Sequence, residues 1–379
     1  MDYKKIFEAC CKKLENHMRE IPKDNPEFCA CEDGKYFENP KPLDFMDIQT
    51  WMPSFFTGQA LLAYEWSKEK RYLEWLEGFQ QVYYDKVYMH AEETMHDLGF
   101  LYLPYAVGLY RLTGEVAYRT MALKAADELA KRFSIKGRFI RAWGRKDDIQ
   151  TENAGEAIID CMMNLPLLFW ASEETGIPFY REIAIEHADT TLKYFVRADG
   201  SVYHAYRFDV ETGKPLWGCN YCGFSDESFW ARGCAWAVYG FMIAYTYTGL
   251  RRFIDVSERL IRRFQEETEK NGDKIPVWDF RLTEDKEQQK DTSAAAIVAS
   301  AAYGLAKCTK KLQYKEYAET LLNELCREEY FDSRAEIPGM LKESNGLGHY
   351  TLFGDFFFME ALLKAINGNE MDVVWRSTT

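Results

Sequence analysis

Apolar residues in this chain follow a helical period, and tight turns interrupt them at intervals. Thr113-Gly114, Thr175-Gly176 and Thr248-Gly249 each end an apolar stretch, and an aromatic residue follows four positions after each glycine. Weaker copies of the pattern lie at Ser67-Lys68 and Thr309-Lys310. Glycine readily takes the left-handed conformation that commonly ends a helix. Such a recurring unit indicates stacked helical hairpins.

The spacing of apolar residues predicts twelve helices, near 3–20, 54–67, 70–85, 96–113, 115–133, 153–174, 178–197, 227–248, 250–270, 291–308, 312–329 and 353–367. Some are apolar on nearly every face, as in 157–170, and others are amphipathic, as in 253–264. A helix that is apolar all round is buried. Six inner and six outer helices predict an all-α fold, an (α/α)6 barrel of six helical hairpins. An open solenoid is the alternative, because the two folds differ only in whether the curvature closes.

Composition favours one catalytic domain over residues 1–379, because no linker rich in Pro, Gly or Ser interrupts the helical rhythm. The net charge of −13 argues against nucleic acid and anionic membranes as partners. No apolar run has the length of a membrane span, and the first residues do not form a secretory signal. We therefore expect a cytoplasmic protein.

The ten cysteines do not predict a metal site or a disulfide framework. Four lie in apolar helical segments, where cysteine is usually a small buried hydrophobe: Cys161, Cys234, Cys308 and Cys326. The pairs Cys29/Cys31 and Cys219/Cys222 have no histidine at zinc-site spacing. We expect reduced thiols and no metal or other cofactor.

Polar and aromatic residues gather in the long connections and in the helix starts that follow them. These residues are Trp51, Phe55, His90, His96, Asp97, Trp143, Asn153, His204, Asp226, Arg232, Trp236, Trp278 and Asp291. Because hairpins place every long connection at the same end of the bundle, we expect these side chains to meet at one mouth. An aromatic and acidic cleft suits sugar rings, which stack on indoles and hydrogen-bond to carboxylates.

Two carboxylates stand out by position. Asp97 lies 17 residues before Gly114 and Asp160 lies 16 before Gly176, which predicts neighbouring places on consecutive inner helices. Asp160 lies in an apolar segment, where burial disfavours the charged form and makes it a proton donor. Asp97 begins a helix, where the dipole favours the anion. Such a divergence is typical of the acid and base pair of carbohydrate enzymes.

Structural interpretations of the same residues stay open. Asp97 as an N-cap and Asp160 as a paired structural acid are alternatives to catalysis. Asp291 is predicted to be a helix cap. His17 and His187 lie on charged helices and are expected to face solvent.

Six segments, in order and within matching hairpins, resemble the unsaturated glucuronyl hydrolases of glycoside hydrolase family 88. They are Trp51–Gly58, His96–Phe100, Arg141–Gly144, Ile159–Leu165, Ser225–Trp236 and Lys290–Ala296. The resemblance covers about residues 50 to 365 and implies an (α/α)6 barrel. It also implies a substrate, the oligosaccharides made by polysaccharide lyases, which carry a 4,5-unsaturated uronic acid at the non-reducing end.

The resemblance also implies roles for individual residues. Asp160 would be the general acid and base, and Asp97 its essential partner. Aromatic walls would come from Trp51, Phe55, Trp143 and Trp236, while His96, His204 and Arg232 would contact the uronate and its hydroxyls. Arg232 suits a carboxylate clamp, because its planar fork bonds two oxygens at once. Its pairing with Asp226 or Glu227 is the alternative.

The chain departs from the family pattern at two cysteines. Cys222 and Cys234 replace glutamines, and a thiol is a poor hydrogen-bond donor, so the sugar or linkage recognised can differ. The loop 342–350 has a single serine and does not decide whether sulfated sugars are preferred.

Three other functions are weighed against this one. Family 105 hydrolases of unsaturated galacturonyl-rhamnose share the barrel and the acid pair. Sugar 2-epimerases use histidines as proton relays in a similar barrel, and a noncatalytic helical scaffold would have no reason to bury Asp160. The sequence does not indicate an oligomeric state.

Overall fold

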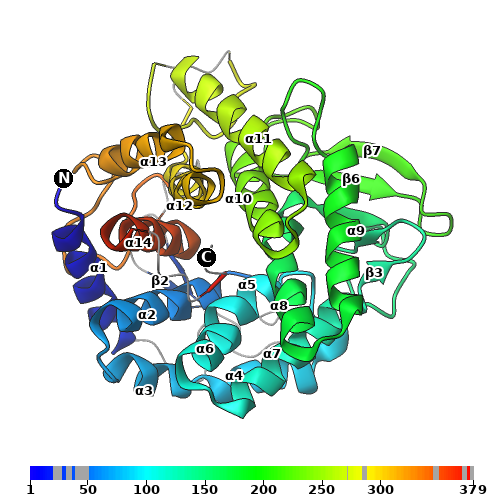
Figure 1. Ribbon diagram of the computed structural model, residues 1–379, viewed down its shortest axis with the longest axis horizontal. Helices are drawn as coiled ribbons and strands as arrows, with labels where there is room; N and C mark the ends of the chain where they lie inside the picture. Colours follow the sequence, from blue (N-terminus) through cyan, green and yellow to red (C-terminus); the bar gives the residue numbers. More distant parts are fainter. Residues whose placement is uncertain are drawn as a thin grey trace.

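A computed structural model of the protein describes residues 1–19, 51–270, 272–283, 288–344, 350–368 and 374–375, with the backbone alone for 28–30 and 36–38. Within these residues, six inner helical elements form a closed ring (Figure 1). In order they are α2 (Pro53–Ser67), α5 (Leu98–Tyr102) with α6 (Gly108–Thr113), α8 (Leu165–Thr175), α10 (Ala231–Thr248), α12 (Thr292–Thr309) and α14 (Leu352–Asn367). Each packs on the next and α14 packs on α2, so the curvature closes and the open solenoid is wrong.

Six outer elements surround this ring in the described part of the chain. They are α1 (Tyr3–Met18), α3 (Arg71–Glu77) with α4 (Gln80–Tyr88), α7 (Val116–Ala130), α9 (Pro178–Tyr194), α11 (Arg251–Lys270) and α13 (Leu312–Leu325). Five inner–outer pairs are consecutive in sequence, while the sixth joins the two ends of the chain, with α1 against α14. The predicted (α/α)6 barrel is confirmed.

The recurring turn has a specific hydrogen-bond pattern. Gly114, Gly176 and Gly249 end their helices with φ of 74°, 72° and 68°, and Lys68 and Lys310 take the same left-handed conformation. At each turn the hydroxyl before this residue accepts a hydrogen bond from the N–H two residues further on, as Thr113 does from Glu115 at 3.2 Å. The aromatic residue that follows is buried, which fixes the outer helix against the inner one.

One predicted helix, 153–174, is wrong in its first half. Residues Glu156–Ile158 form strand β5, Ile159–Met163 form a 3-10 turn (η4), and α8 begins only at Leu165. Strand β5 pairs antiparallel with β6 (Ala205–Phe208), which pairs with β7 (Pro215–Cys219). Gly155 permits this pairing, because a Cβ there would lie 2.0 Å from the carbonyl oxygen of Phe208.

Two smaller departures complete the fold. Strands β3 (Phe133–Ser134) and β4 (Phe139–Ile140) form a hairpin, as do β1 (Phe28–Ala30) and β2 (Tyr36–Glu38). A π-helical turn, η3 (Leu103–Val107), separates α5 from α6, and a short 3-10 turn, η2, spans Ala91–Glu93. The three-stranded sheet lies beside α9, outside the ring (Figure 1).

The prediction that His17 and His187 face solvent is wrong. His187 is fully buried on the inward face of α9, where its Nδ1 accepts a hydrogen bond from the Ile140 backbone at 2.9 Å. Burial lowers the pKa of His187 to about 3, so the ring is neutral. His17 is also buried. Charged neighbours along a helix therefore did not reveal which face these histidines occupy.

In the described residues, no helix combines the length and the apolar character that crossing a membrane requires. The eight cysteines with described side chains are free thiols: Cys10, Cys11, Cys161, Cys219, Cys222, Cys234, Cys308 and Cys326. Cys29 and Cys31 lie outside the residues with described side chains.

Candidate active site

Asp97 and Asp160 lie on two segments that touch directly. Asp97 is the residue before α5, and Asp160 lies in η4. The Asn164 amide joins the segments, because its Oδ1 accepts from the Phe100 N–H at 2.7 Å and its Nδ2 donates to the Asp160 carbonyl at 3.2 Å. Gly99 makes the contact possible, since a Cβ there would lie 2.3 Å from the Asn164 Cα. The two carboxylates are close enough for the charge of Asp160 to raise the pKa of Asp97.

The raised pKa predicted for Asp160 agrees with the structure, but the prediction that Asp97 is held as the anion is wrong. Burial, and then the charge of Asp160, raise the pKa of Asp97 to about 8. Burial also raises the pKa of Asp160, but the nearby positive charge of Arg232 limits it to about 6. Burial outweighs the predicted effect of the helix start on Asp97, and the Asp97 side chain makes no capping hydrogen bond. In the free enzyme the pair therefore retains a proton near neutral pH, which the two carboxylates share.

His204 faces Asp160 as a neutral donor. The Tyr221 N–H donates to His204 Nδ1 at 3.1 Å, so this nitrogen is unprotonated and a neutral ring carries its proton on Nε2. Burial, reinforced by the charge of Arg232, lowers the pKa of His204 to about 3. Its Nε2 lies 3.7 Å from Asp160 Oδ2 and 3.8 Å from the Cys222 sulfur.

His96 stands in the same relation to the other carboxylate. Its Nε2 lies 3.4 Å from Asp97 Oδ1, and its side chain is fully buried. Burial and the charge of Arg132 lower its pKa well below the usual value, so it is neutral too. Within the described residues, neither ring nitrogen of His96 has a hydrogen-bond partner of good geometry.

Arg232 is paired, but with neither of the residues considered from the sequence. Its Nη1 lies 2.6 Å from Asp291 Oδ2, and its guanidinium stacks on the rings of Trp230 and Phe353 at 4.6 and 5.1 Å. Asp291 is also the N-cap of α12, as predicted, because its other oxygen accepts from the Ala294 N–H at 3.0 Å. One buried carboxylate therefore orients the arginine and begins the inner helix that follows.

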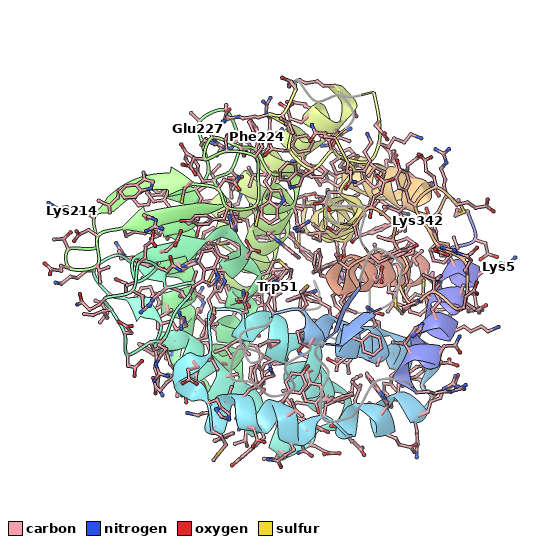
Figure 2. All side chains as sticks on the ribbon, turned by 180° about the vertical axis from the view of Figure 1, so that it is seen from behind. Lys5, Trp51, Lys214, Phe224, Glu227 and Lys342 are labelled. Atoms are coloured by element: carbon pink, nitrogen blue, oxygen red, sulfur yellow. The ribbon has the colours of Figure 1, made fainter. Side chains whose placement is uncertain are left out.

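Of the four predicted aromatic walls, two are accessible and two lie beneath them. Trp51 is partly exposed near the barrel axis (Figure 2) and stacks on Phe353 at 4.9 Å, while Trp143 is partly exposed beside His204 at 6.4 Å. Phe55 and Trp236 are fully buried against Trp51. The expectation that these two contact sugar is wrong for this structure, because their rings support Trp51 from within the core.

The two cysteines that replace glutamines occupy different environments. Cys222 lies at the mouth beside His204, and burial raises its pKa to about 12, so it is a neutral thiol. Cys234 is fully buried, and its sulfur lies 4.0 Å from the carbonyl oxygen of Leu260 in the outer helix α11. Cys234 therefore points away from the mouth, and only Cys222 bears on recognition.

Arg132, which no sequence pattern indicated, holds the loops around the pair. Its guanidinium donates to five backbone carbonyls, those of Thr94, Arg141, Ala142, Trp143 and Gly144, at 2.6–3.2 Å. It is buried, and its charge acts on Asp97 and His96. Arg132 thus fixes the segment before Asp97 and the loop of Trp143 to one point.

Two other regions do not add to the site. Residues 345–349 of the loop 342–350 lie outside the described residues, and Ser344 is buried and hydrogen-bonded to Thr351 at 2.5 Å.

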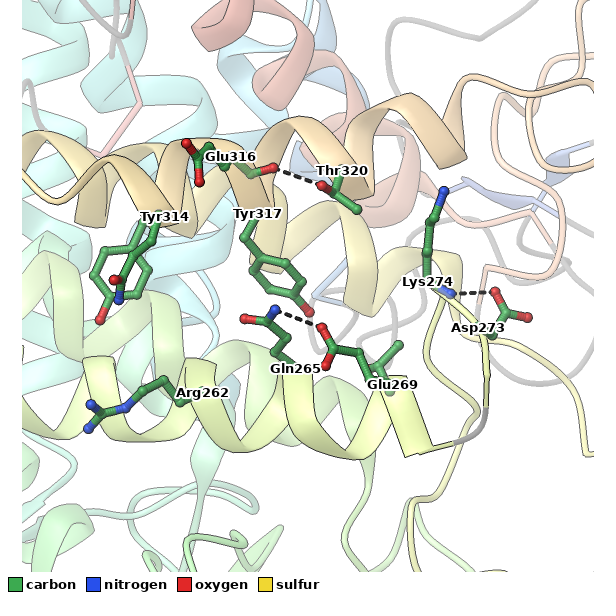
Figure 3. A pocket seen from close by; sticks show the side chains of 11 residues that line it. Arg262, Gln265, Glu269, Asp273, Lys274, Tyr314, Glu316, Tyr317 and Thr320 are labelled. Carbon is green, nitrogen blue, oxygen red and sulfur yellow. Dashed lines mark hydrogen bonds between the residues drawn. The ribbon is translucent and has the colours of Figure 1, made fainter.

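A polar groove of about 300 Å³ lies between the outer helices α11 and α13 (Figure 3). Several of its side chains are already bonded to neighbouring groups, as Gln265 is to Glu269 at 2.7 Å and Tyr314 to Glu258 at 2.9 Å. No three His, Cys, Asp or Glu side chains in the described parts of the chain form a group that could hold a metal ion.

The closed barrel and its paired carboxylates define an α/α-barrel glycoside hydrolase. The model of Glycosyl Hydrolase Family 88 matches residues 30–367, and the chain belongs to this family. The sugar epimerase and the noncatalytic scaffold are therefore set aside.

Characterised relatives match most of the chain. An unsaturated chondroitin disaccharide hydrolase of Streptococcus agalactiae serotype III (strain NEM316) is 33% identical over 350 residues, 86% of this chain and 85% of its own. An unsaturated glucuronyl hydrolase of Bacillus sp. (strain GL1) is 32% identical over 338 residues, covering 85% and 88%. The crystal structure of the unsaturated glucuronyl hydrolase from Bacillus sp. GL1 superposes with a TM-score of 0.87 at 29% identity, over 97% of each chain.

Proposed function

We propose that this enzyme is an unsaturated glucuronyl hydrolase, which releases the 4,5-unsaturated uronic acid from the non-reducing end of lyase-generated oligosaccharides. The observation that carries the proposal is the pair of buried carboxylates on two touching segments, Asp97 and Asp160, whose raised pKa values keep a proton at the site near neutral pH. Protonating the carbon of an enol ether requires such an acid. The names of the relatives support the same substrate class.

In the proposed reaction, Asp160 donates its proton to C4 of the C4–C5 double bond. Positive charge develops on C5 and the ring oxygen, and an ionised Asp97 stabilises it. Water then adds its oxygen to C5 and returns one proton to Asp160, which regenerates the acid. The resulting hemiketal opens at the bond between C5 and the ring oxygen, and the remaining sugar leaves from C1.

Substrate binding explains why the proton shared by the pair comes to reside on Asp160. Arg232 lowers the pKa of Asp160 through its positive charge. A uronate bound to Arg232 neutralises that charge and adds a negative charge nearby, so the pKa of Asp160 rises. The proton then moves to Asp160 only when the correct anionic sugar is present, which leaves Asp97 ionised for the transition state.

The remaining side chains bind the substrate in this proposal. Arg232, oriented by Asp291, holds the uronate, and the Nε2–H of His204 donates to a substrate oxygen. Trp51 and Trp143 stack on sugar rings. Cys222 lies close to His204, but its thiol is a weak hydrogen-bond donor. The substrate hydroxyl nearest to Cys222 is therefore bound more weakly than it would be by a glutamine amide at this position. A cytoplasmic location remains a prediction.

The test uses purified protein and a panel of lyase-generated disaccharides, including unsaturated galacturonyl-rhamnose, the family 105 substrate. Loss of the ultraviolet absorbance of the C4–C5 double bond reports the first step directly. Asp160→Asn is expected to lower kcat by at least roughly 100-fold, the low end of the contribution of general acid catalysis. Asp226→Asn is the matched control, since Asp226 is an exposed aspartate of a mouth loop. Unchanged absorbance with every disaccharide would overturn the proposal.

A further inference from the structure

A row of aromatic and polar side chains leaves the proposed active site along one face of the β5–β6–β7 sheet. Trp143 packs on the buried part of this face, formed by Ala142, Ile158, Ala205 and Cys219. The Tyr221 ring lies 5.6 Å from the Trp143 ring. Its hydroxyl accepts from Arg207 Nη2 at 3.0 Å, and the Arg207 guanidinium lies 6.0 Å from the Trp217 ring.

The strand register explains this row. Cys219 pairs with Ala205 and Trp217 pairs with Arg207, so both pairs lie on the same face. Two residues of strand advance the chain by about 7 Å, and Trp217 therefore lies further from His204 than Cys219 does. Trp217 and Tyr221 are 53% and 49% exposed, although aromatic side chains of this size are usually buried. We define Trp143, Tyr221, Arg207 and Trp217 as the sheet ledge.

We infer that the sheet ledge is an outer sugar-binding subsite, which takes the sugar units of oligosaccharides longer than a disaccharide. The inference rests on the proposed function. Exposed aromatic rings next to hydroxyl and guanidinium groups suit the mixed apolar and polar surface of a sugar ring. The ledge is continuous with the active site, because Tyr221 donates its backbone N–H to His204 and packs on Trp143.

The charges on the ledge favour sugar rings without a required anionic group. Arg207 Nη2 lies 3.7 Å from the buried Glu156 carboxylate and 3.6 Å from Glu152. Its positive charge is thus compensated within the protein. The hydroxyl of Tyr221 is already oriented by Arg207, so its ring is fixed at little further cost in conformational freedom when a ligand binds. Stacking, and not ion pairing, should supply the affinity of this subsite.

The experiment compares an unsaturated disaccharide with an unsaturated tetrasaccharide from the same polysaccharide. Trp217→Ala is expected to lower kcat/KM for the tetrasaccharide roughly two- to tenfold, the effect of losing one aromatic stacking contact. The disaccharide, which does not reach Trp217, should be hydrolysed as by the unmodified enzyme. Phe179→Ala is the matched control, because Phe179 is also an exposed aromatic residue, at 59%, but lies in the outer helix α9 and not on the sheet ledge.

The outcomes separate the two proposals. Absence of hydrolysis of either substrate by the unmodified enzyme overturns the proposed function. Hydrolysis of the disaccharide with no change in the tetrasaccharide-to-disaccharide ratio in Trp217→Ala overturns the outer subsite alone. A concentration-dependent dimer that Trp217→Ala dissociates, without a change in that ratio, would assign the exposed rings to self-association instead, and would also overturn it.

Discussion

Gly99 sets the distance between the two carboxylates, and Gly99→Ala tests the site geometry directly. A Cβ at this position would lie 2.3 Å from the Asn164 Cα and 2.6 Å from its carbonyl oxygen. Both atoms belong to backbone, so no side-chain rotation relieves the contact. Cβ atoms essentially never lie closer than 3.0 Å to another atom, so the two segments must separate by at least 3.0 − 2.3 = 0.7 Å, and by 3.4 − 2.3 = 1.1 Å to reach ordinary contact.

This separation should cost activity far more than stability. Overpacking of this kind destabilises by about 1–3 kcal/mol, and alanine in place of glycine within a helix returns up to about 1 kcal/mol. The net loss in the free energy of unfolding is thus about 0–2 kcal/mol. A 1 Å misplacement of catalytic groups, in contrast, costs roughly 100-fold in rate. Asp97 and Asp160 move apart with their segments, so kcat should fall by about that factor.

The assay measures urea unfolding and hydrolysis of an unsaturated disaccharide for the same protein preparation. Gly114→Ala is the control, because it introduces the same methyl group at the other end of the same inner element, where nothing lies within 4 Å. Its left-handed backbone, with φ of 74°, makes alanine cost about 1 kcal/mol there, while activity should be retained. A folded Gly99→Ala enzyme whose kcat stays within threefold of the unmodified enzyme would refute the reasoning.

Two further substitutions test the electrostatics and the support of the site by urea unfolding. Because burial raises the pKa of Asp97 to about 8, against about 3.9 in the unfolded chain, the folded state binds the extra proton between these values. The free energy of unfolding contributed by this group therefore falls as pH rises from about 4 to 8. Asp97→Asn cannot ionise, so at pH 8 its free energy of unfolding should exceed that of the unmodified enzyme by on the order of a few kcal/mol. At pH 5 this advantage should be smaller. An equal difference at both pH values would contradict the prediction. Arg132→Met removes a buried donor from five backbone carbonyls, of which those of Ala142 and Trp143 keep a second donor, and should cost about 3–5 kcal/mol. Arg145→Met, which removes only exposed ion pairs of the same loop, should cost less than about 1 kcal/mol; similar losses in both variants would show that Arg132 has no special role.

The barrel was predictable because its signals are local. A hydroxyl residue, a left-handed position and an aromatic residue four positions later specify each turn, and Thr113 shows the bonds that do so. Apolar faces separate inner from outer helices by the same local pattern. Closure of the ring was open from the sequence, because the contact between α2 and α14 joins segments far apart in the chain.

The helix predicted around Asp160 was wrong because its true structure depends on a contact that is distant in sequence. The apolar run before it fits a buried helix and a buried strand equally well. Pairing with residues 205–207 of β6 decides for a strand, and these partners are distant in sequence. The raised pKa of Asp97 was likewise not predictable, because burial in the folded core, and then the charge of Asp160 on another segment, raise it.

The catalytic pair lies where the inner ring departs from regular α-helix. Asp97 precedes a five-residue helix that runs into a π-helical turn, and Asp160 lies in a 3-10 turn after a strand. Such irregular turns are often found at functional sites, and here they bring two carboxylates together in the core, where each raises the free-energy cost of the other's charge. That cost is tolerable because the remaining inner helices and Arg132 hold the segments in place. The same burial that lowers the stability of the protein therefore keeps a proton on the pair at neutral pH. An Asp97→Asn enzyme would be more stable but less active.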